Sequence, residues 1–249
     1  YFVPTQKELV EKVGDYDALL VRIGLHINRE VVDAAKNLKV IATATTGLNH
    51  IDVSYAKQKG IQVLSLKDEI GFLDTITSTA ELAFGLMIDL MRLTPWAFES
   101  VKNYELKLEE FKGWSLHGKT LGIVGMGRLG KIMAEGAAGW RMNVVFYDPH
   151  VPQEKFQRFK KVSFDEALAQ SDAISVHAHL SPETEKMFGE KEFSKMKKTA
   201  YLINTSRGEI VDEDALLKAL ENKKIAGYAT DVLSNELNLV KNFSNHPLV

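Results

Sequence analysis

The feature that most limits the folds open to this sequence is a regular alternation between short apolar runs and helix-like segments. The runs are ALLVRI (18–23), LKVIATA (38–44), IQVLSL (61–66), TLGIVG (120–125), NVVFYD (143–148), AISVHA (173–178), AYLINT (200–205) and IAGYATD (225–231). Strands that alternate with helices are typical of parallel sheets covered by helices. The sequence therefore predicts an α/β fold.

Start signals support several of the intervening helices. SFDEAL contains a capping box, in which Ser163 is the N-cap and Glu166 lies three residues later. In SPETEK, Pro182 follows Ser181, a pattern favoured where a helix begins. DEDALLKALENKK (212–224) carries its acids first and its lysines last, which matches the helix dipole. We therefore expect a helix after each of these signals.

The chain divides most naturally near RLTPW (92–96). A long apolar helix is expected over about 74–93, and Pro95 ends it. After a further helical stretch and a loop, the strand TLGIVG opens a new α/β unit. We therefore predict two doubly wound parallel-sheet domains, 1–93 and 94–249, of which the first is the smaller.

Composition excludes several classes of function. The 249 residues include no cysteine, which rules out disulfides, thiolate catalysis and cysteine-bound metals. The formal net charge is −2 with both signs well mixed, so the sequence does not indicate a nucleic-acid or membrane surface. The segment AELAFGLMIDLM carries Glu81 and Asp89 and favours a core helix over a membrane span. The first residues do not resemble a signal peptide, so we expect a cytoplasmic protein.

The strongest local pattern is TLGIVGMGRLGKIMAEG, in which Gly125, Gly127 and Gly130 follow an apolar strand with G-x-G-x-x-G spacing. These glycines permit a tight turn, close approach to a pyrophosphate and packing of the next helix on the strand. Asp148 ends the following strand, where a carboxylate can accept both ribose hydroxyls and would repel a 2′-phosphate. A glycine-rich packing turn is the alternative. The surrounding strand, helix and acid favour binding of NAD over NADP.

A second pattern, AYLINTSRGEIVDEDAL, predicts a strand, a turn and the start of a helix. Residues 204–208 then lie at the carboxyl end of a strand, which is the edge that forms the ligand crevice in open parallel sheets. Arg207 could bind a carboxylate there through two hydrogen bonds. Taken alone, Arg207 would be interpreted as part of a surface ion pair.

Several stretches in the same order resemble the D-isomer-specific 2-hydroxyacid dehydrogenase family. LINTSRGEIVDEDAL resembles its arginine signature, and GIVGMGRLGKIMA its dinucleotide signature. VIATATTGLNHIDVSYAKQKGIQVLS resembles its substrate-loop segment, and TSTAELAFGLMIDLMR its inter-domain helix. The resemblance implies a flavodoxin-like substrate domain followed by a Rossmann NAD-binding domain. The implied reaction is hydride transfer between NAD and C2 of a D-2-hydroxy or 2-keto acid.

The resemblance also implies a catalytic set. Arg207 matches the arginine that orients the acid and stabilises negative charge on its C2 oxygen. Glu236, in TDVLSNEL, stands where the family has a glutamate that favours the protonated form of a catalytic histidine. That histidine acts as general acid in reduction and general base in oxidation. Without the resemblance, Glu236 would be interpreted as a solvated loop acid.

Contacts carry over position by position. The cofactor is expected at Gly125, Gly127, Arg128, Leu129, Gly130, Asp148, Ala178, His179, Thr184, Thr205, Ser206 and Asp231. The substrate carboxylate is expected at Thr46, Gly47, Leu48 and Arg207. The family often has proline where this chain has His179, so that contact departs from the family pattern. His177 and His179 also form an H-x-H pair, but no third ligand is evident, so no metal is predicted.

Two further positions concern the substrate. Arg22 stands where some members have an arginine near the substrate, whereas Ile23 stands where phosphate-binding members often have serine. This pair makes a phosphorylated substrate less favoured without excluding it. The remaining histidines are expected as surface, loop or supporting groups and not as catalysts: His26, His50, His117 and His150.

The sequence ends NFSNHPLV, and His246 there precedes what resembles the first residues of another strand. His246 would lie at the amino edge of the sheet, away from ligands. The family's catalytic histidine is therefore expected beyond Val249, and the first domain is expected to lack its first strand and helix. As it stands, the chain is expected to bind NAD and to turn over poorly or not at all.

Two alternatives stay open. One is an NAD-binding regulatory protein on the same scaffold, similar to corepressor relatives of the family and with little turnover. The other is an NAD-dependent dehydrogenase of a different Rossmann class. The resemblance also implies a homodimer built on residues 96–111, with an active site in each inter-domain cleft.

Overall fold

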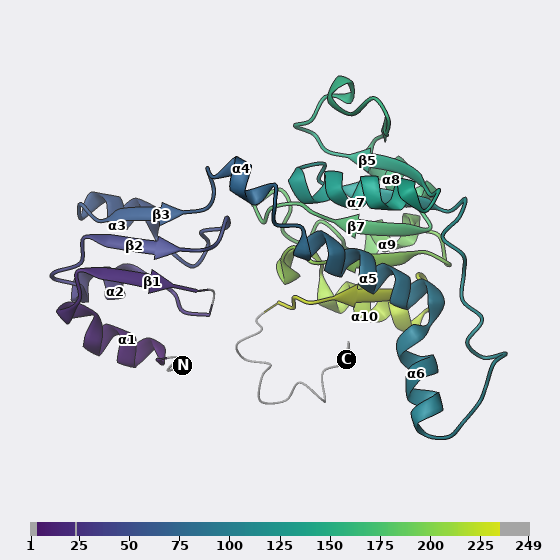
Figure 1. Cartoon of the computed structure of the whole chain (residues 1–249), viewed down its shortest axis with the longest axis horizontal. Helices are drawn as coiled ribbons and strands as arrows, with labels where there is room; N and C mark the ends of the chain where they lie inside the picture. Colours follow the sequence, from purple (N-terminus) through teal and green to yellow (C-terminus); the bar gives the residue numbers. More distant parts are fainter. Residues whose placement is uncertain (1–3, 23, 235–249) are drawn as a thin grey trace. The chain divides into compact units, whose positions relative to one another are not determined.

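The computed structural model of the chain describes residues 4–22 and 24–234, and these form two compact units that divide between Ile76 and Thr77 (Figure 1). Each unit contains one sheet in which all strand pairs are parallel. Every apolar run predicted as a strand forms one. The predicted α/β class is therefore confirmed.

The first unit is a three-stranded sheet in the order β1-β2-β3. Its elements are α1 (Gln6–Lys12), η1 (Val13–Asp15), β1 (Ala18–Val21), α2 (Arg29–Ala34), β2 (Val40–Thr43), α3 (Val53–Gln58), β3 (Gln62–Ser65) and α4 (Ile70–Leu73). Side chains alternate between the two faces of a strand. The buried residues Val21 and Ile41 pack with the helices, whereas Leu20 on the opposite face is 79% exposed. The helical cover of this sheet therefore lies on one face.

The second unit contains a six-stranded sheet in the order β6-β5-β4-β7-β8-β9. Its elements are α5 (Ser78–Arg92), α6 (Thr94–Lys102), β4 (Thr120–Val124), α7 (Arg128–Gly139), β5 (Asn143–Tyr147), η2 (Gln153–Phe156), β6 (Lys160–Lys161), α8 (Phe164–Gln170), β7 (Ala173–Val176), α9 (Glu190–Lys195), β8 (Tyr201–Asn204), η3 (Gly208–Ile210), α10 (Glu213–Glu221) and β9 (Gly227–Thr230). This order is that of the doubly wound dinucleotide-binding fold, and the strand order reverses between β4 and β7.

Helices cover both faces of the six-stranded sheet (Figure 1). On one face, Met87 of α5 and Met133 of α7 pack with Ile123 and Phe146 of the strands. On the other face, helices α8, α9 and α10 pack on the sheet through buried side chains such as Leu168, Phe193 and Leu216. The sheet is therefore the middle layer of three. Its outer strands and the ends of its strands, which form its amino and carboxyl edges, are the parts that the helices leave accessible.

The boundary between the units differs from the expected one. The sequence placed the boundary between 93 and 94, but the compact units divide after Ile76. The reason is that α5 buries Ala83, Met87 and Met91 in the core of the second unit. The sequence of an apolar helix between two domains does not show which of the two sheets its apolar face will cover.

Local expectations had mixed outcomes. The capping box at Ser163 and Glu166 opens α8, and the acids at 212–214 open α10. The signal at Ser181 opens only a turn, because Lys186 has a left-handed φ of 51° and its N–H donates to Glu209 O. Pro95 does not simply end a helix: it lies in the first turn of α6, after Leu93 in a left-handed conformation. The two-residue strand β6 was not predicted.

Candidate functional site

The glycine loop joins β4 to α7 at the carboxyl edge of the six-stranded sheet. Gly125 has a φ of +94°, and a Cβ there would lie 2.7 Å from the His177 backbone. A Cβ on Gly130 would lie 2.2 Å from Gly125 O, so the helix packs directly on the turn. A Cβ on Gly127 would meet nothing within 4 Å. The outer two glycines are therefore required by packing, whereas Gly127 is exposed and leaves open space in front of the loop.

The amino end of α7 faces that open space. Gly127 is its N-cap and, having no side chain, leaves the first-turn N–H groups without a side-chain cap. Such donors, together with the helix dipole, favour a phosphate group. This arrangement fits a dinucleotide pyrophosphate, with Arg128 and Leu129, both half-buried, following in the first turn.

Asp148 follows β5 and is tied to the glycine loop. Its Oδ2 accepts a hydrogen bond from Met126 N at 2.8 Å, and its Oδ1 accepts one from His150 N at 2.8 Å. Each carboxylate oxygen keeps a free lone pair for a ribose hydroxyl. The sequence indicated a ribose acceptor here but not the bond to Met126, because nothing in the spacing shows which backbone N–H a carboxylate will reach.

The segment after β7 crosses the same edge. His177 Nε2 lies 2.9 Å from Ser175 Oγ, and Nδ1 has no hydrogen-bond partner among the described residues. Burial lowers the pKa of His177 to about 4, so this imidazole is neutral at pH 7. Ala178 is half-buried and His179 exposed. Thr184 shapes the loop, since its hydroxyl donates to His179 O at 2.6 Å and accepts from Ser181 N at 2.8 Å.

The arginine loop follows β8, next to β7 in the sheet. The buried Asn204 organises it: its amide group donates to Arg207 O at 2.8 Å and accepts from Ser206 N at 3.0 Å. Ser206 Oγ donates to Val176 O at 2.7 Å, which ties the loop to the end of β7. Thr205 is buried. Its Oγ1 has no hydrogen-bond partner among the residues described.

Arg207 itself is half-buried, and its Nη1 donates to Ser206 O at 2.7 Å. The guanidinium is therefore presented on a loop whose backbone is held by Asn204. The ordering role of Asn204 was missed in the sequence; its place at the end of a buried strand is the signal that could have indicated it.

The end of β9 supplies the last part of this edge. Thr230 Oγ1 donates to Asn204 O at 2.7 Å and accepts from Val232 N at 3.0 Å. The turn after β9 is therefore hydrogen-bonded to the residue that begins the arginine loop. Asp231 is exposed in that turn. Glu236 and His246 lie outside the described residues, as does Ile23 in the first unit.

In the first unit, Thr46, Gly47 and Leu48 form the loop after β2, with Thr46 exposed. Thr45 Oγ1 donates to Gly47 O at 2.8 Å. His50 is buried at 7% exposure, and its Nε2 lies 3.5 Å from Thr43 Oγ1. His50 is thus a supporting group beneath the loop and not a surface residue.

Arg22, which stands where some family members have an arginine near the substrate, is exposed. The other histidines expected not to be catalysts are also exposed: His26, His117 and His150. Among the residues that the structure covers, no group of three His, Asp or Glu side chains could hold a metal ion. None of the helices in the described part of the chain is long and apolar enough to cross a bilayer.

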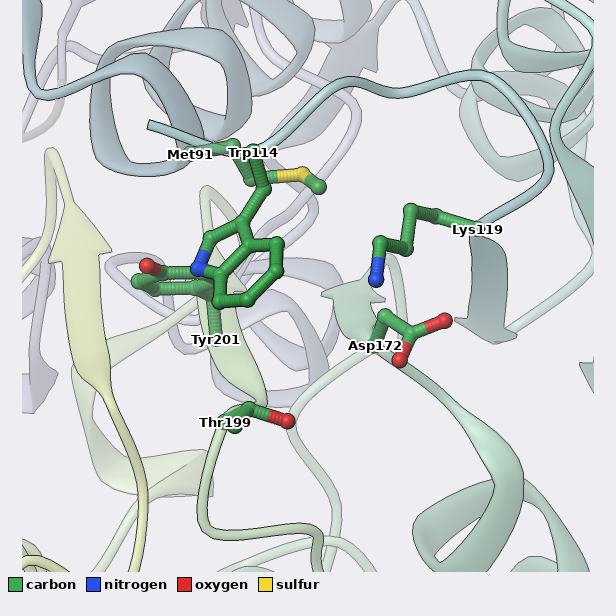
Figure 2. Close-up of a pocket in the computed structure, with 6 residues that line it drawn as sticks. All are labelled: Met91, Trp114, Lys119, Asp172, Thr199 and Tyr201. Carbon is green, nitrogen blue, oxygen red and sulfur yellow. The ribbon is translucent and has the colours of Figure 1, made fainter. Parts of the chain in front are cut away.

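The opposite, amino edge of the sheet holds a small hollow of about 40 Å³ (Figure 2). Lys119 and Asp172 directly precede β4 and β7 there, and Trp114 and Tyr201 complete the lining with Met91 and Thr199. Lys119 Nζ lies 4.8 Å from the centre of the Trp114 ring. Burial opposes the charge of Asp172, but the Thr120 N–H and Lys197 Nζ hold its pKa below the usual range. These contacts anchor the loop that leads from α6 into β4.

Trp114 N donates to Met91 O, and a Cβ on Gly113 would lie 2.4 Å from that same oxygen. The loop before β4 therefore lies directly on the end of α5. This edge is closed by paired side chains, in contrast to the glycine loop.

Comparisons with known proteins agree with this geometry. Residues 84–249 match the family model "D-isomer specific 2-hydroxyacid dehydrogenase, NAD binding domain". The chain is 39% identical to D-3-phosphoglycerate dehydrogenase of Methanocaldococcus jannaschii, over 93% of this chain and 44% of that protein. It is 38% identical to glyoxylate reductase of Thermococcus litoralis, over 94% of this chain and 72% of that protein. The chain therefore spans less than half the length of the first relative and nearly three quarters of the second.

Among solved structures, D-lactate dehydrogenase from Aquifex aeolicus in complex with NAD and lactic acid superposes with a TM-score of 0.83. The identity is 30%, over 95% of this chain and 71% of that one. The expected cofactor, NAD, is the one for which the matched domain is named. With its strand order, its glycine loop and this family match, the chain belongs to the D-isomer-specific 2-hydroxyacid dehydrogenase family.

Proposed function

We propose that this protein is an NAD-dependent oxidoreductase that transfers a hydride between NAD(H) and C2 of a D-2-hydroxy or 2-keto acid. The observation that carries the proposal is Arg207 on a loop fixed by Asn204, at the same sheet edge as the open glycine loop. A guanidinium at this edge can bind a carboxylate and stabilise charge on a neighbouring oxygen. The family to which the chain belongs supports this reaction class.

We also propose which residues would bind each part of the cofactor. The N–H groups of Gly127, Arg128 and Leu129 would hold the pyrophosphate, with Asp148 on a ribose. The nicotinamide end would lie over Thr205, Ser206 and Asp231, and the adenine end near Ala178, His179 and Thr184. When bound, NAD would supply the hydride acceptor or donor.

Substrate binding and proton transfer would use residues outside the cofactor site. We propose that Thr46, Gly47 and Leu48 contact the substrate carboxylate through backbone N–H groups, because their loop follows a strand and Thr46 is exposed. Arg207 would polarise the C2 oxygen. Glu236 would raise the pKa of the general acid–base histidine of the reaction, since a nearby carboxylate favours imidazolium.

The regulatory alternative is less well supported, because the three relatives described above are named as two dehydrogenases and a reductase. Their names cover phosphoglycerate, glyoxylate and lactate chemistry, so the acid itself stays open. We keep a small 2-keto acid as the proposed substrate and a cytoplasmic location as a prediction.

We also propose a homodimer. The arm formed by α6 and the loop after it exposes Phe98 at 68%, Leu106 at 75% and Leu108 at 71%, and α6 extends beyond the sheet of its unit (Figure 1). Apolar side chains that gather on one segment are typical of a protein interface. A second copy of the same arm is the partner implied by the family resemblance.

The direct test is turnover of NADH with a panel of 2-keto acids by the full-length protein, before and after Arg207→Ala. Removing one group that stabilises charge in the transition state should lower kcat/KM by at least about a hundredfold, with NADH affinity nearly unchanged. Arg158→Ala, an exposed arginine beside β6, is the matched control and should behave as the unaltered protein. Near-normal turnover after Arg207→Ala would contradict the proposal, and NADH binding with no turnover of any keto acid would favour the regulatory protein.

A further inference from the structure

The segment that leaves β9 lies directly against the arginine loop. A Cβ on Gly208 would lie 2.2 Å from both Leu233 C and Ser234 N. No side chain fits between these two stretches of backbone, so Gly208 permits a direct contact. Leu233 is buried at 8% exposure beside it. The close approach of Leu233 and Ser234 to the arginine loop therefore requires glycine at position 208.

A side chain of α10 closes the same contact. Glu213, the first residue of α10, accepts a hydrogen bond from Ser234 N through Oε1 at 2.7 Å. Both Glu213 and Ser234 are half-buried. A charged acceptor makes such a bond shorter and stronger than one between neutral groups. The turn at Thr230 and this bond hold the segment at both ends, directly before the stretch that carries Glu236.

We propose that Glu213 is a positioning residue: by binding Ser234 N it fixes residues 231–234, which directly precede the stretch containing Glu236 in the sequence, against the arginine loop. The inference rests on the proposed function, in which Arg207 and Glu236 act on one substrate. Glu213 touches neither substrate nor cofactor in this proposal. It acts only through the backbone, together with the close approach at Gly208.

Glu213 could also act only by stabilising its own helix, and this role can be distinguished experimentally from positioning. An acid in the first turn of α10 also stabilises the helix through its dipole. Asp214 lies in the same turn and is exposed, so Asp214→Ala removes the same kind of charge without touching Ser234. Glu213→Gln removes the charge but keeps a side-chain oxygen that can accept from Ser234 N.

The test compares Glu213→Ala, Glu213→Gln and Asp214→Ala with the unaltered full-length protein, with circular dichroism and NADH affinity as checks of folding. Amide hydrogen exchange of the peptide spanning residues 231–236 reports the contact. Loss of one hydrogen bond should accelerate exchange there about five- to tenfold in Glu213→Ala. Exchange should stay near the unaltered rate in Asp214→Ala and should rise much less in Glu213→Gln than in Glu213→Ala, because the neutral amide oxygen still accepts from Ser234 N.

The second readout is the pH profile of 2-keto acid reduction. Reduction needs the protonated acid–base group, and a displaced Glu236 would no longer raise the pKa of that group. The alkaline limb of kcat/KM should therefore move to lower pH in Glu213→Ala and stay in place in the other two variants. Mere destabilisation would lower activity evenly without moving the limb.

Unchanged exchange in Glu213→Ala would show that the Glu213–Ser234 hydrogen bond does not hold residues 231–234. Equal acceleration in Glu213→Gln and Glu213→Ala would show that a side-chain oxygen at position 213 is not enough to hold them. Faster exchange with an unmoved alkaline limb would overturn positioning while leaving the proposed function intact. Absence of turnover in the unaltered protein would remove the proposed function and the positioning role together, and the exchange data would still show whether the contact exists.

Discussion

The two edges of the six-stranded sheet differ in what closes them. At the amino edge, Asp172 binds the Thr120 N–H at 2.8 Å and Lys197 Nζ at 2.9 Å, and Trp114 lies beside Lys119. At the carboxyl edge, the first turn of α7 has no side-chain cap and Gly127 faces open space. One edge has polar groups that are paired by side chains, whereas the other presents a helix end that no side chain caps.

The difference shows how one sheet separates folding from function. Parallel strands place all their carboxyl ends together, so loops at that edge can vary while the opposite edge supports the fold. Substitutions at the amino edge should therefore change stability and leave cofactor affinity alone. At the carboxyl edge the two effects should be separable residue by residue.

The largest expected effect is that of Gly125→Ala. The left-handed φ of +94° disfavours alanine, and the new Cβ would collide with the His177 backbone 2.7 Å away. Strain and overpacking together should lower the free energy of unfolding by about 2–5 kcal/mol and abolish NADH binding. Denaturant unfolding followed by tryptophan fluorescence measures this in the second unit, which contains Trp96, Trp114 and Trp140.

Gly127→Ala is the matched control for that experiment. Its Cβ would meet nothing within 4 Å in the protein, so stability should fall by no more than about 1 kcal/mol, the cost of a poorer N-cap. NADH affinity should nevertheless fall, because the methyl group occupies the space in front of the helix. Unchanged NADH affinity in this variant would contradict the assignment of the carboxyl edge as the cofactor site.

The next effect is a pH dependence of stability. Burial lowers the pKa of His177 from 6.5 to about 4, so the folded protein binds a proton there less readily than the unfolded chain does. Stability should therefore fall as pH drops from about 6.5 to about 4, by at most about 3 kcal/mol from this group. His177→Gln should flatten that part of the profile, whereas substitution of the exposed His150 should not. An equal slope in both variants would exclude His177 as the source.

The smallest effect is expected at the amino edge, for Asp172→Asn. The amide can still accept from Thr120 N but loses the ion pair with Lys197, so the loss of stability at pH 7 should be about 1 kcal/mol. The folded pKa of Asp172 is lowered, so its contribution is present above the unfolded value of 3.8 and disappears as pH falls through the folded pKa. NADH affinity should be unchanged, and a clear loss of affinity would show that the two edges are coupled.

Much of the fold could be predicted from sequence patterns, because strands, helix starts and tight turns depend on residues that are close together in the sequence. The apolar runs became strands, the capping box at Ser163 became the start of α8, and the glycine spacing marked the turn before α7. The failures share another cause. The side that α5 covers and the turn at Ser181 depend on residues distant in the chain, such as Glu209 for the N–H of Lys186.

The sequence by itself determined the family, the cofactor class and the position of Arg207 at the end of a strand, because each depends on residue type and short spacing. Only the tertiary structure decided which groups hold those residues in place. Asn204 beneath Arg207, Met126 on Asp148 and Glu213 on Ser234 are side-chain to backbone contacts. Every residue except proline offers the same backbone N–H and C=O groups, so a sequence does not show which of them a side chain will reach.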